Sequence, residues 1–363
     1  MLKTKPCVFA IKNRYEITVL VAEPSIMWVK IGDKCYYDEV NGIMRSAKPV
    51  HKICVPMSEL DKAGEYTVYE RAVIDRPPYF QKVSEESSHT YKFYPVKSES
   101  ARAYLVADTH GNADEPVKAA KAYGDIDFLV LNGDIQDDSS KLENFNTIFE
   151  IAARLTNGEK PVVFSRGNHD MRGACAELFP DYTPTDNGNT YYTFRLGSIW
   201  GMVLDSGEDK DDSYKEYGHL VCCHGFRERE TEFIRSVIEN ADSEYNHPAV
   251  KTKLVIAHNP FTEQIGDPMF DIEADIYREW GRLLRENIKP HAMLSGHIHK
   301  RYVSCPNDEH DHLGHPSPVV VSSVLDRENN YYGGCGVEFG NGSVTVTFTG
   351  SDGEITEKIE IKK

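Results

Sequence analysis

The sequence predicts an α/β layered domain that follows a small all-β domain. Residues 1–97 contain short runs in which polar and apolar residues alternate, rich in Val, Ile, Thr and Tyr and separated by Pro, Gly, Asp and Asn. From residue 98 onward, apolar runs of strand length alternate with stretches of helical periodicity. We therefore expect a domain boundary near residue 97, with residues 98–363 forming the α/β domain.

The N-terminal strands are expected to form a sandwich of the fibronectin III or immunoglobulin type. The runs that predict them are "YEITVLVA", "SIMWVKIG", "HKICVPM", "GEYTVYERAVI" and "TYKFYPV". Their period of two buries one face of each strand and exposes the other. No cluster of metal ligands or nucleophiles lies among them, so we expect this region to contribute no site residue.

The second region begins with five apolar runs that each read as a buried strand. They are "AYLVAD", "DFLVLNGD", "PVVFSRGNHD", "KLVIAHNP" and "HAMLSGHIH". Helical stretches separate several of them, namely "EPVKAAKAY", "LENFNTIFEIAARL", "RETEFIRSVIEN" and "DIYREWGRLLREN". After residue 300, "PVVVSSVLD", "GVEFG" and "SVTVTFTG" return to strands, which predicts that a second sheet completes the same domain.

The charge balance excludes some classes of partner. The 363 residues include 57 acidic and 41 basic side chains, for a formal net charge of -16. Non-specific binding to nucleic acid or to an anionic membrane needs a basic surface, so both are disfavoured. No segment approaches the ~20 apolar residues that span a bilayer, and the start of the chain lacks the apolar core of a signal peptide. We expect a cytoplasmic protein.

Potential metal ligands follow each of the five strands. They are Asp108, His110, Asp134, Asn168, His169, His258, His297 and His299. Such residues converge where the carboxyl ends of parallel strands meet. A mixture of carboxylate, amide and imidazole donors suits Mn, Fe, Zn or Ni better than Ca or Mg. Eight donors are more than one ion needs, so two divalent or transition-metal ions ~4 Å apart are expected.

These blocks carry a family resemblance. The series D-x-H, G-D-x-x-D, G-N-H-D, a strand-end His and G-H-x-H occurs in order between about residues 100 and 305, and it resembles the calcineurin-like metallophosphoesterase superfamily. The resemblance implies a four-layer α/β/β/α sandwich. It also implies hydrolysis of phosphomonoesters or phosphodiesters by a hydroxide that bridges two metal ions. The β-rich N-terminal region is similar in layout to that of purple acid phosphatases.

The resemblance also implies a role for each ligand. One metal would be held by Asp108, His110, Asp134 and His299, and the second by Asp134, Asn168, His258 and His297. Asp134 would bridge the two ions. His169 matches the outer-shell histidine that protonates the leaving oxygen or stabilises charge in the transition state. Asp137 matches the carboxylate that orients this imidazole.

Departures from individual subfamilies narrow the expected chemistry. Purple acid phosphatases have a tyrosine ligand where this chain has Asp137, and they lack the histidine that His110 supplies, so a purple Fe(III) centre is disfavoured. Arg166, just before "GNHD", either binds the substrate phosphate or forms a structural salt bridge. Residues 206–219 are either an active-site lid or an exposed loop.

Three functions remain open on the sequence. The first is an enzyme that hydrolyses a small phosphorylated substrate. The second is a metal-binding or scaffold protein that keeps the fold without turnover, and the third is a nuclease of the same superfamily. The acidic charge disfavours a long polyanion such as nucleic acid. The substrate and the oligomeric state stay open.

Overall fold

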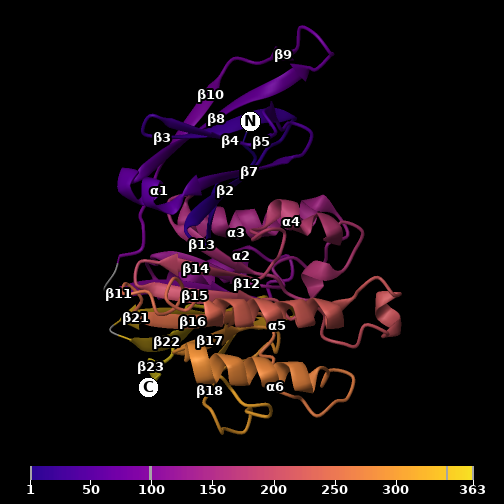
Figure 1. The fold of residues 1–363 in the computed structure, drawn as a ribbon, viewed down its shortest axis with the longest axis vertical. Helices are drawn as coiled ribbons and strands as arrows, with labels where there is room; N and C mark the ends of the chain where they lie inside the picture. Colours follow the sequence, from indigo (N-terminus) through magenta and orange to yellow (C-terminus); the bar gives the residue numbers. More distant parts are fainter. Residues whose placement is uncertain (1, 98–99, 341, 362–363) are drawn as a thin grey trace.

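The fold is built on two large β-sheets that face each other. The computed structural model describes residues 2–97, 100–340 and 342–361 (Figure 1). Within these ranges, a ten-stranded sheet has the order β23-β22-β21-β11-β12-β13-β1-β2-β7, with β20 paired to β21, and a six-stranded sheet has the order β14-β15-β16-β17-β19-β18. The first sheet consists of β1 (Cys7–Ile11), β2 (Arg14–Leu20), β7 (Val50–Pro56), β11 (Ser100–Val106), β12 (Phe128–Asn132), β13 (Pro161–Ser165), β20 (Val324–Asp326), β21 (Tyr331–Gly340), β22 (Ser343–Gly350) and β23 (Ile359–Ile361). The second consists of β14 (Tyr192–Leu196), β15 (Ile199–Leu204), β16 (Thr252–Ala257), β17 (Ala292–Ser295), β18 (Arg301–Ser304) and β19 (Val319–Ser322).

Helices cover the outer face of each sheet, which gives four layers. The helices α2 (Asp114–Tyr123) and α3 (Asn146–Thr156) share an apolar cluster with the ten-stranded sheet. The helices α5 (Cys223–Glu239) and α6 (Ala274–Leu283) do the same with the six-stranded sheet. A third cluster, which includes Leu105, Val130, Leu254 and Leu294, fills the space between the two sheets. The predicted α/β/β/α layering is confirmed.

The N-terminal region is all-β apart from the short helix α1 (Met57–Ala63). Its second sheet has the order β10-β8-β3-β4, with β9 paired to β8. The strands are β3 (Ser25–Ile31), β4 (Lys34–Tyr37), β8 (Glu65–Asp75), β9 (Lys82–Val83) and β10 (Ser87–Lys92), and a small hairpin pairs β5 (Glu39–Val40) with β6 (Ile43–Met44). Met27, Val29 and Val68 pack from this sheet against Ile17 and Ile53 of β2 and β7 in one buried cluster. Two packed layers of strands are therefore present, as predicted.

One layer of this N-terminal sandwich belongs to the ten-stranded sheet, which differs from the expected separate domain. Strand β1 pairs in parallel with β13, with Val8 opposite Pro161 and Phe9 opposite Val162. Strands β2 and β7 continue the same sheet beyond β1. The boundary expected at residue 97 therefore does not separate two independent cores. The reason is visible in "CVFAI", whose five residues are all buried, a pattern typical of a strand covered on both faces.

This shared sheet predicts that residues 1–97 and the rest of the chain unfold together. Trp28 lies in the N-terminal sheet, whereas Trp200 and Trp280 lie in the α/β part. We expect thermal unfolding followed by Trp28 fluorescence, in a variant with both other tryptophans changed to Phe, to coincide with loss of helical circular dichroism. Two transitions separated by more than the measurement error would contradict the shared core.

The remaining elements are short. They are the helix α4 (Phe179–Tyr182), the 3-10 turns Leu142–Phe145, His169–Met171, Ala176–Leu178 and Lys215–Tyr217, and a π-helical turn at Leu284–Ile288. Across the described ranges, none of the helices has the length and apolar character required to cross a membrane.

Candidate metal centre

The predicted ligands lie on tight turns that follow the strands. Five of them have a left-handed backbone although none is glycine: Asp108 (φ 53), His110 (φ 46), Asp134 (φ 51), His297 (φ 68) and His299 (φ 53). Asp and His enter this region more readily than most residues, but the conformation still costs about 1–3 kcal/mol each. Such strain is typical of functional sites, where surrounding structure holds side chains in a required direction.

Close packing of these turns also explains one glycine. A Cβ atom added to Gly167 would overlap with both the Oδ1 atom and the backbone nitrogen of Asp134. Only glycine lets the loop after β13 approach the loop after β12 this closely. The close approach places Asn168 and His169 beside Asp134.

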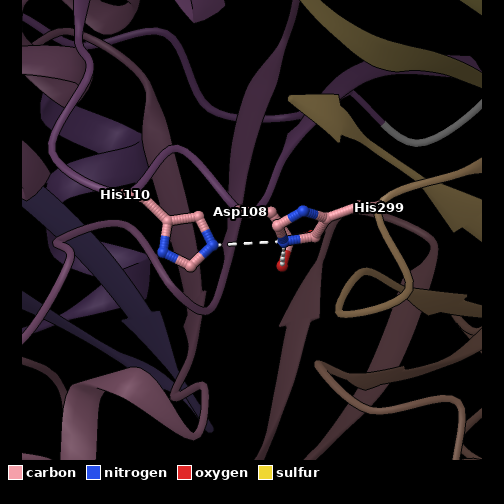
Figure 2. A group of neighbouring side chains, drawn as sticks. All are labelled: Asp108, His110 and His299. Atoms are coloured by element: carbon pink, nitrogen blue, oxygen red, sulfur yellow. Dashed lines mark hydrogen bonds and ion pairs between the residues drawn. The ribbon is translucent and has the colours of Figure 1, made fainter. Parts of the chain in front are cut away.

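A first group of donors consists of Asp108, His110 and His299 (Figure 2). The Nε2 atoms of His110 and His299 are 3.1 Å apart, and His299 Nε2 lies 3.5 Å from Asp108 Oδ1. The Asp108 carboxylate is fully buried and accepts hydrogen bonds from the His297 backbone N–H, at 2.9 Å, and from the Ser323 hydroxyl. These bonds orient the carboxylate toward the two imidazoles.

A second group consists of Asp134, His258 and His297. His258 donates its Nδ1 hydrogen to the carbonyl of Asn132, at 2.7 Å, and its Nε2 lies 3.2 Å from Asp134 Oδ2. A hydrogen bond at Nδ1 leaves the lone pair of Nε2 free for a metal. Asp134 is not among the donors that cluster within 4.8 Å in the first group, so its bridging role stays a prediction.

Asn168 lies beside the second group of donors. Its Oδ1 lies 3.1 Å from His297 Nδ1. With the amide reversed, its nitrogen could donate to His297 Nδ1 and Asp134 Oδ2, at 3.1 and 3.3 Å, and its oxygen could accept from Arg172 Nη2 at 3.0 Å. The carboxylate, imidazole and amide donors gathered here are of the types that suit a transition-metal ion.

Opposing charges perturb the ionisation of these groups. Burial lowers the pKa of His258, but Asp134 and Asp108 outweigh it and raise the pKa to about 10. Burial also opposes the charge on Asp134, yet His258 holds the pKa of this carboxyl well below its usual range. By contrast, burial lowers the pKa of His110 to about 4. His258 and Asp134 therefore form a buried ion pair, with His258 Nε2 3.2 Å from Asp134 Oδ2.

This ion pair predicts that metal uptake releases a proton. A metal ligand must be neutral imidazole, whereas metal-free His258 stays protonated below about pH 10. At pH 7, binding should release about one proton from His258, and the apparent affinity should rise with pH up to about pH 10. Calorimetric titration in buffers of different ionisation enthalpy measures the released protons. The same release from His258→Gln would contradict the assignment.

The outer-shell histidine is held by two hydrogen bonds. His169 donates its Nδ1 hydrogen to the backbone carbonyl of Asp137, at 2.9 Å, and its backbone N–H to Asp134 Oδ1, at 2.9 Å. The carboxylate of Asp137 instead lies 3.3 Å from His110 Nδ1 and pairs with Arg327. The donor atoms of Asp137, His110 and His169 all lie within 4.8 Å of one another, so the role of the Asp137 carboxylate in orienting the His169 imidazole stays a prediction.

Arg166 forms the structural salt bridge that the sequence left as an alternative. Its Nε lies 2.7 Å from Asp205 Oδ2, and the ion pair is buried. The arginine beside the centre is Arg172, which was not predicted from the sequence; its Nη1 lies 3.5 Å from His169 Nε2. Arg172 follows His169 by three residues in "GNHDMR", and that spacing was the available signal. Two carboxylates, Glu208 and Asp209, hold its guanidinium at 2.8–3.2 Å.

Residues 206–219 are partly buried rather than an entirely exposed loop. Glu208 and Lys210 are buried, and Arg227 of α5 donates to the carbonyls of Ser206 and Glu208. The first part of the segment is therefore fixed beside the centre through Arg172. The turn from Asp211 onward is more exposed.

A cleft of about 370 Å³ opens next to the second group of donors. Asp134, Asn168, His169, His297 and His299 form its floor on the side of the centre. Asp137 and His169 form a third group of donors with His110. Of the residues predicted for the site, all but Arg166 belong to one of the three groups or, as Asn168 does, contact one of their members. The centre thus has room beside it for an organic molecule.

One solved structure is similar to this fold across nearly the whole chain. Across the full chain, a purple acid phosphatase, PPD1 from yellow lupin (Lupinus luteus) seeds, is similar with a TM-score of 0.62 and 13% identity, covering 99% of this chain and 74% of that one. Two further structures have a TM-score of only 0.37. One is Vacuolar Protein Sorting 29 from Cryptosporidium parvum, with 13% identity, covering 73% of this chain and 100% of that one. The other is TT1561 of Thermus thermophilus, with 15% identity, covering 72% of this chain and 99% of that one.

Sequence comparison identifies the family directly. No curated protein matches the chain by sequence. Residues 101–301, the segment that contains every predicted metal ligand, match the family described as calcineurin-like phosphoesterase. The lupin enzyme, at 13% identity, supports the fold alone. On the family match, the chain belongs to the calcineurin-like phosphoesterase family.

Proposed function

We propose that the protein is a phosphoric ester hydrolase that depends on two metal ions and acts on a small phosphomonoester or phosphodiester. The observation that carries the proposal is the pair of donor groups around Asp108 and Asp134, which lie side by side at one edge of the sheets. When bound, two ions would polarise the phosphoryl oxygens and activate a water molecule near neutral pH. Mn, Fe, Zn and Ni are the ions that suit this donor set.

The chain's own residues position the reacting groups. The first ion would be held by Asp108, His110 and His299, and the second by Asn168, His258 and His297, with Asp134 shared. His169 is anchored through Nδ1, so its Nε2 is the atom available to exchange a proton with the leaving oxygen. The carboxylate of Asp137 lies 3.3 Å from His110 Nδ1 and would help to hold this imidazole toward a bound ion.

The experiment that tests this proposal separates an enzyme from a silent scaffold. The metal-free protein is loaded with Mn, Fe, Zn or Ni in turn and assayed against a panel of aryl phosphomonoesters and bis-aryl phosphodiesters. We expect turnover that depends on metal and saturates near two ions per chain. Two bound ions without turnover of any ester would favour the scaffold alternative, and a stoichiometry that never exceeds one would exclude the dinuclear centre.

A further inference from the structure

The wall of the cleft beside the metal centre combines apolar and polar side chains. Its apolar lining consists mainly of Phe261, Phe270, Ile272, Tyr277, Ile298 and Leu313. Phe261, Tyr277 and Leu313 belong to the buried core behind α6, so they form a fixed surface rather than a flexible loop. A volume of about 370 Å³ is enough for an aromatic ring or a branched chain.

The charges on this wall are predominantly negative. Outside the metal ligands, the described residues that line the cleft include three carboxylates, Asp209, Glu263 and Asp271, and one cationic side chain, Lys300. Asp209 forms ion pairs with both Arg172 and Lys210. Glu208 also pairs with Arg172, and Glu216 with Lys210, so these three carboxylates outnumber the two cations. The wall therefore keeps an excess of negative charge next to the site of reaction.

Glu263 and Asp271 are held in fixed positions by hydrogen bonds and ion pairs with protein groups. Glu263 accepts from the Tyr302 hydroxyl at 2.5 Å and lies 2.9 Å from His310 Nδ1. Asp271 accepts from the backbone N–H groups of Ile265 and Gly266, at 2.8 and 2.9 Å. Because their positions are fixed, these carboxylates exert a constant electrostatic field on a substrate bound in the cleft.

We propose that the cleft binds the alcohol portion of the ester, and that this portion is an apolar group that is neutral or cationic but not anionic. This inference rests on the proposed hydrolysis and adds the substrate class. The metal centre attracts the phosphoryl group, whereas the cleft repels a second negative charge on the leaving group. Nucleoside polyphosphates and acidic phosphopeptides are therefore poor substrates, and aryl or branched alkyl phosphates are good ones.

The test uses two phosphomonoesters that differ in charge but not in leaving-group acidity. They are 3-(carboxymethyl)phenyl phosphate and its methyl ester, in which a methylene insulates the phenol from the charge. We expect kcat/KM for the methyl ester to exceed that for the acid by at least about tenfold at low salt. Because the effect is electrostatic, the ratio should fall as ionic strength rises.

A charge variant and a matched control locate the effect. Glu263→Gln keeps the shape of the side chain and an acceptor for Tyr302, and it should reduce the ratio by a factor of about three. Glu239→Gln makes the same change on an exposed residue at the far end of α5 and should leave the ratio unchanged. If the Glu263→Gln variant is poorly folded, the salt dependence of the unchanged protein decides the question.

The outcomes separate this inference from the proposed function. Hydrolysis of both esters at equal kcat/KM, or with no effect of salt, would overturn the inference and leave phosphoester hydrolysis intact. Faster hydrolysis of the acid would overturn it as well. No hydrolysis of either ester, nor of any member of the wider panel, would overturn the proposed function itself.

Discussion

Asp134→Asn should reduce the metal content from about two ions per chain to one or fewer and abolish nearly all turnover. The side chain is buried, Oδ2 lies 3.2 Å from His258 Nε2, and Oδ1 accepts the His169 backbone N–H at 2.9 Å. Asparagine keeps the shape of the side chain but removes its negative charge, which acts on both donor groups. Burial lowers the pKa of His110, and Asp134 opposes this effect. Asp134 also contributes to the raised pKa of His299, after Asp108. The loss should exceed the roughly 10–100-fold typical of outer-shell partners.

Elemental analysis and steady-state kinetics measure the two parts of this prediction. Asp125→Asn is a matched control, because Asp125 is exposed on the loop between α2 and β12. It should bind two ions and keep its kcat. Retention of two tightly bound ions by the Asp134→Asn variant would show that Asp134 does not bridge them.

His169→Ala should lower kcat by about 10²–10⁴-fold while leaving metal content nearly unchanged. The imidazole is not part of either proposed ligand set, and alanine keeps the backbone N–H that supports Asp134. If His169 protonates the leaving oxygen, the loss should shrink for a nitrophenolate, which departs without a proton. A plot of log kcat against leaving-group pKa should be steeper for the variant.

The control for this variant is His89→Ala, an exposed histidine on β10 that lies outside the centre. It should keep the kinetics and the metal content of the unchanged protein. An equal loss in the His169→Ala variant for every leaving group would instead assign His169 to charge stabilisation. Loss of a metal ion from this variant would contradict its place outside the ligand sets.

The sequence predicted much of the architecture because strand and helix periodicities are local properties. The alternation after residue 98 placed α2, α3, α5 and α6 between apolar strands, and the structure has the four layers that the family resemblance implied. It did not reveal that β1 pairs with β13, because the two strands are about 150 residues apart and pairing depends on contacts between distant segments. The apolar run "CVFAI" is typical of a strand covered on both faces, but it does not show which strand lies beside it.

For the site, the sequence by itself identified the candidate donors, since each strand-end motif carries its potential ligand at a fixed position along the chain. Only the tertiary structure decided which atoms of those residues face one another. The backbone carbonyl of Asp137 accepts from His169 Nδ1, whereas its carboxylate lies 3.3 Å from His110 Nδ1. Arg166 forms an ion pair with Asp205. Arg172 Nη1 lies 3.5 Å from His169 Nε2. The direction of a side chain depends on backbone angles and packing, which residue type and spacing do not specify.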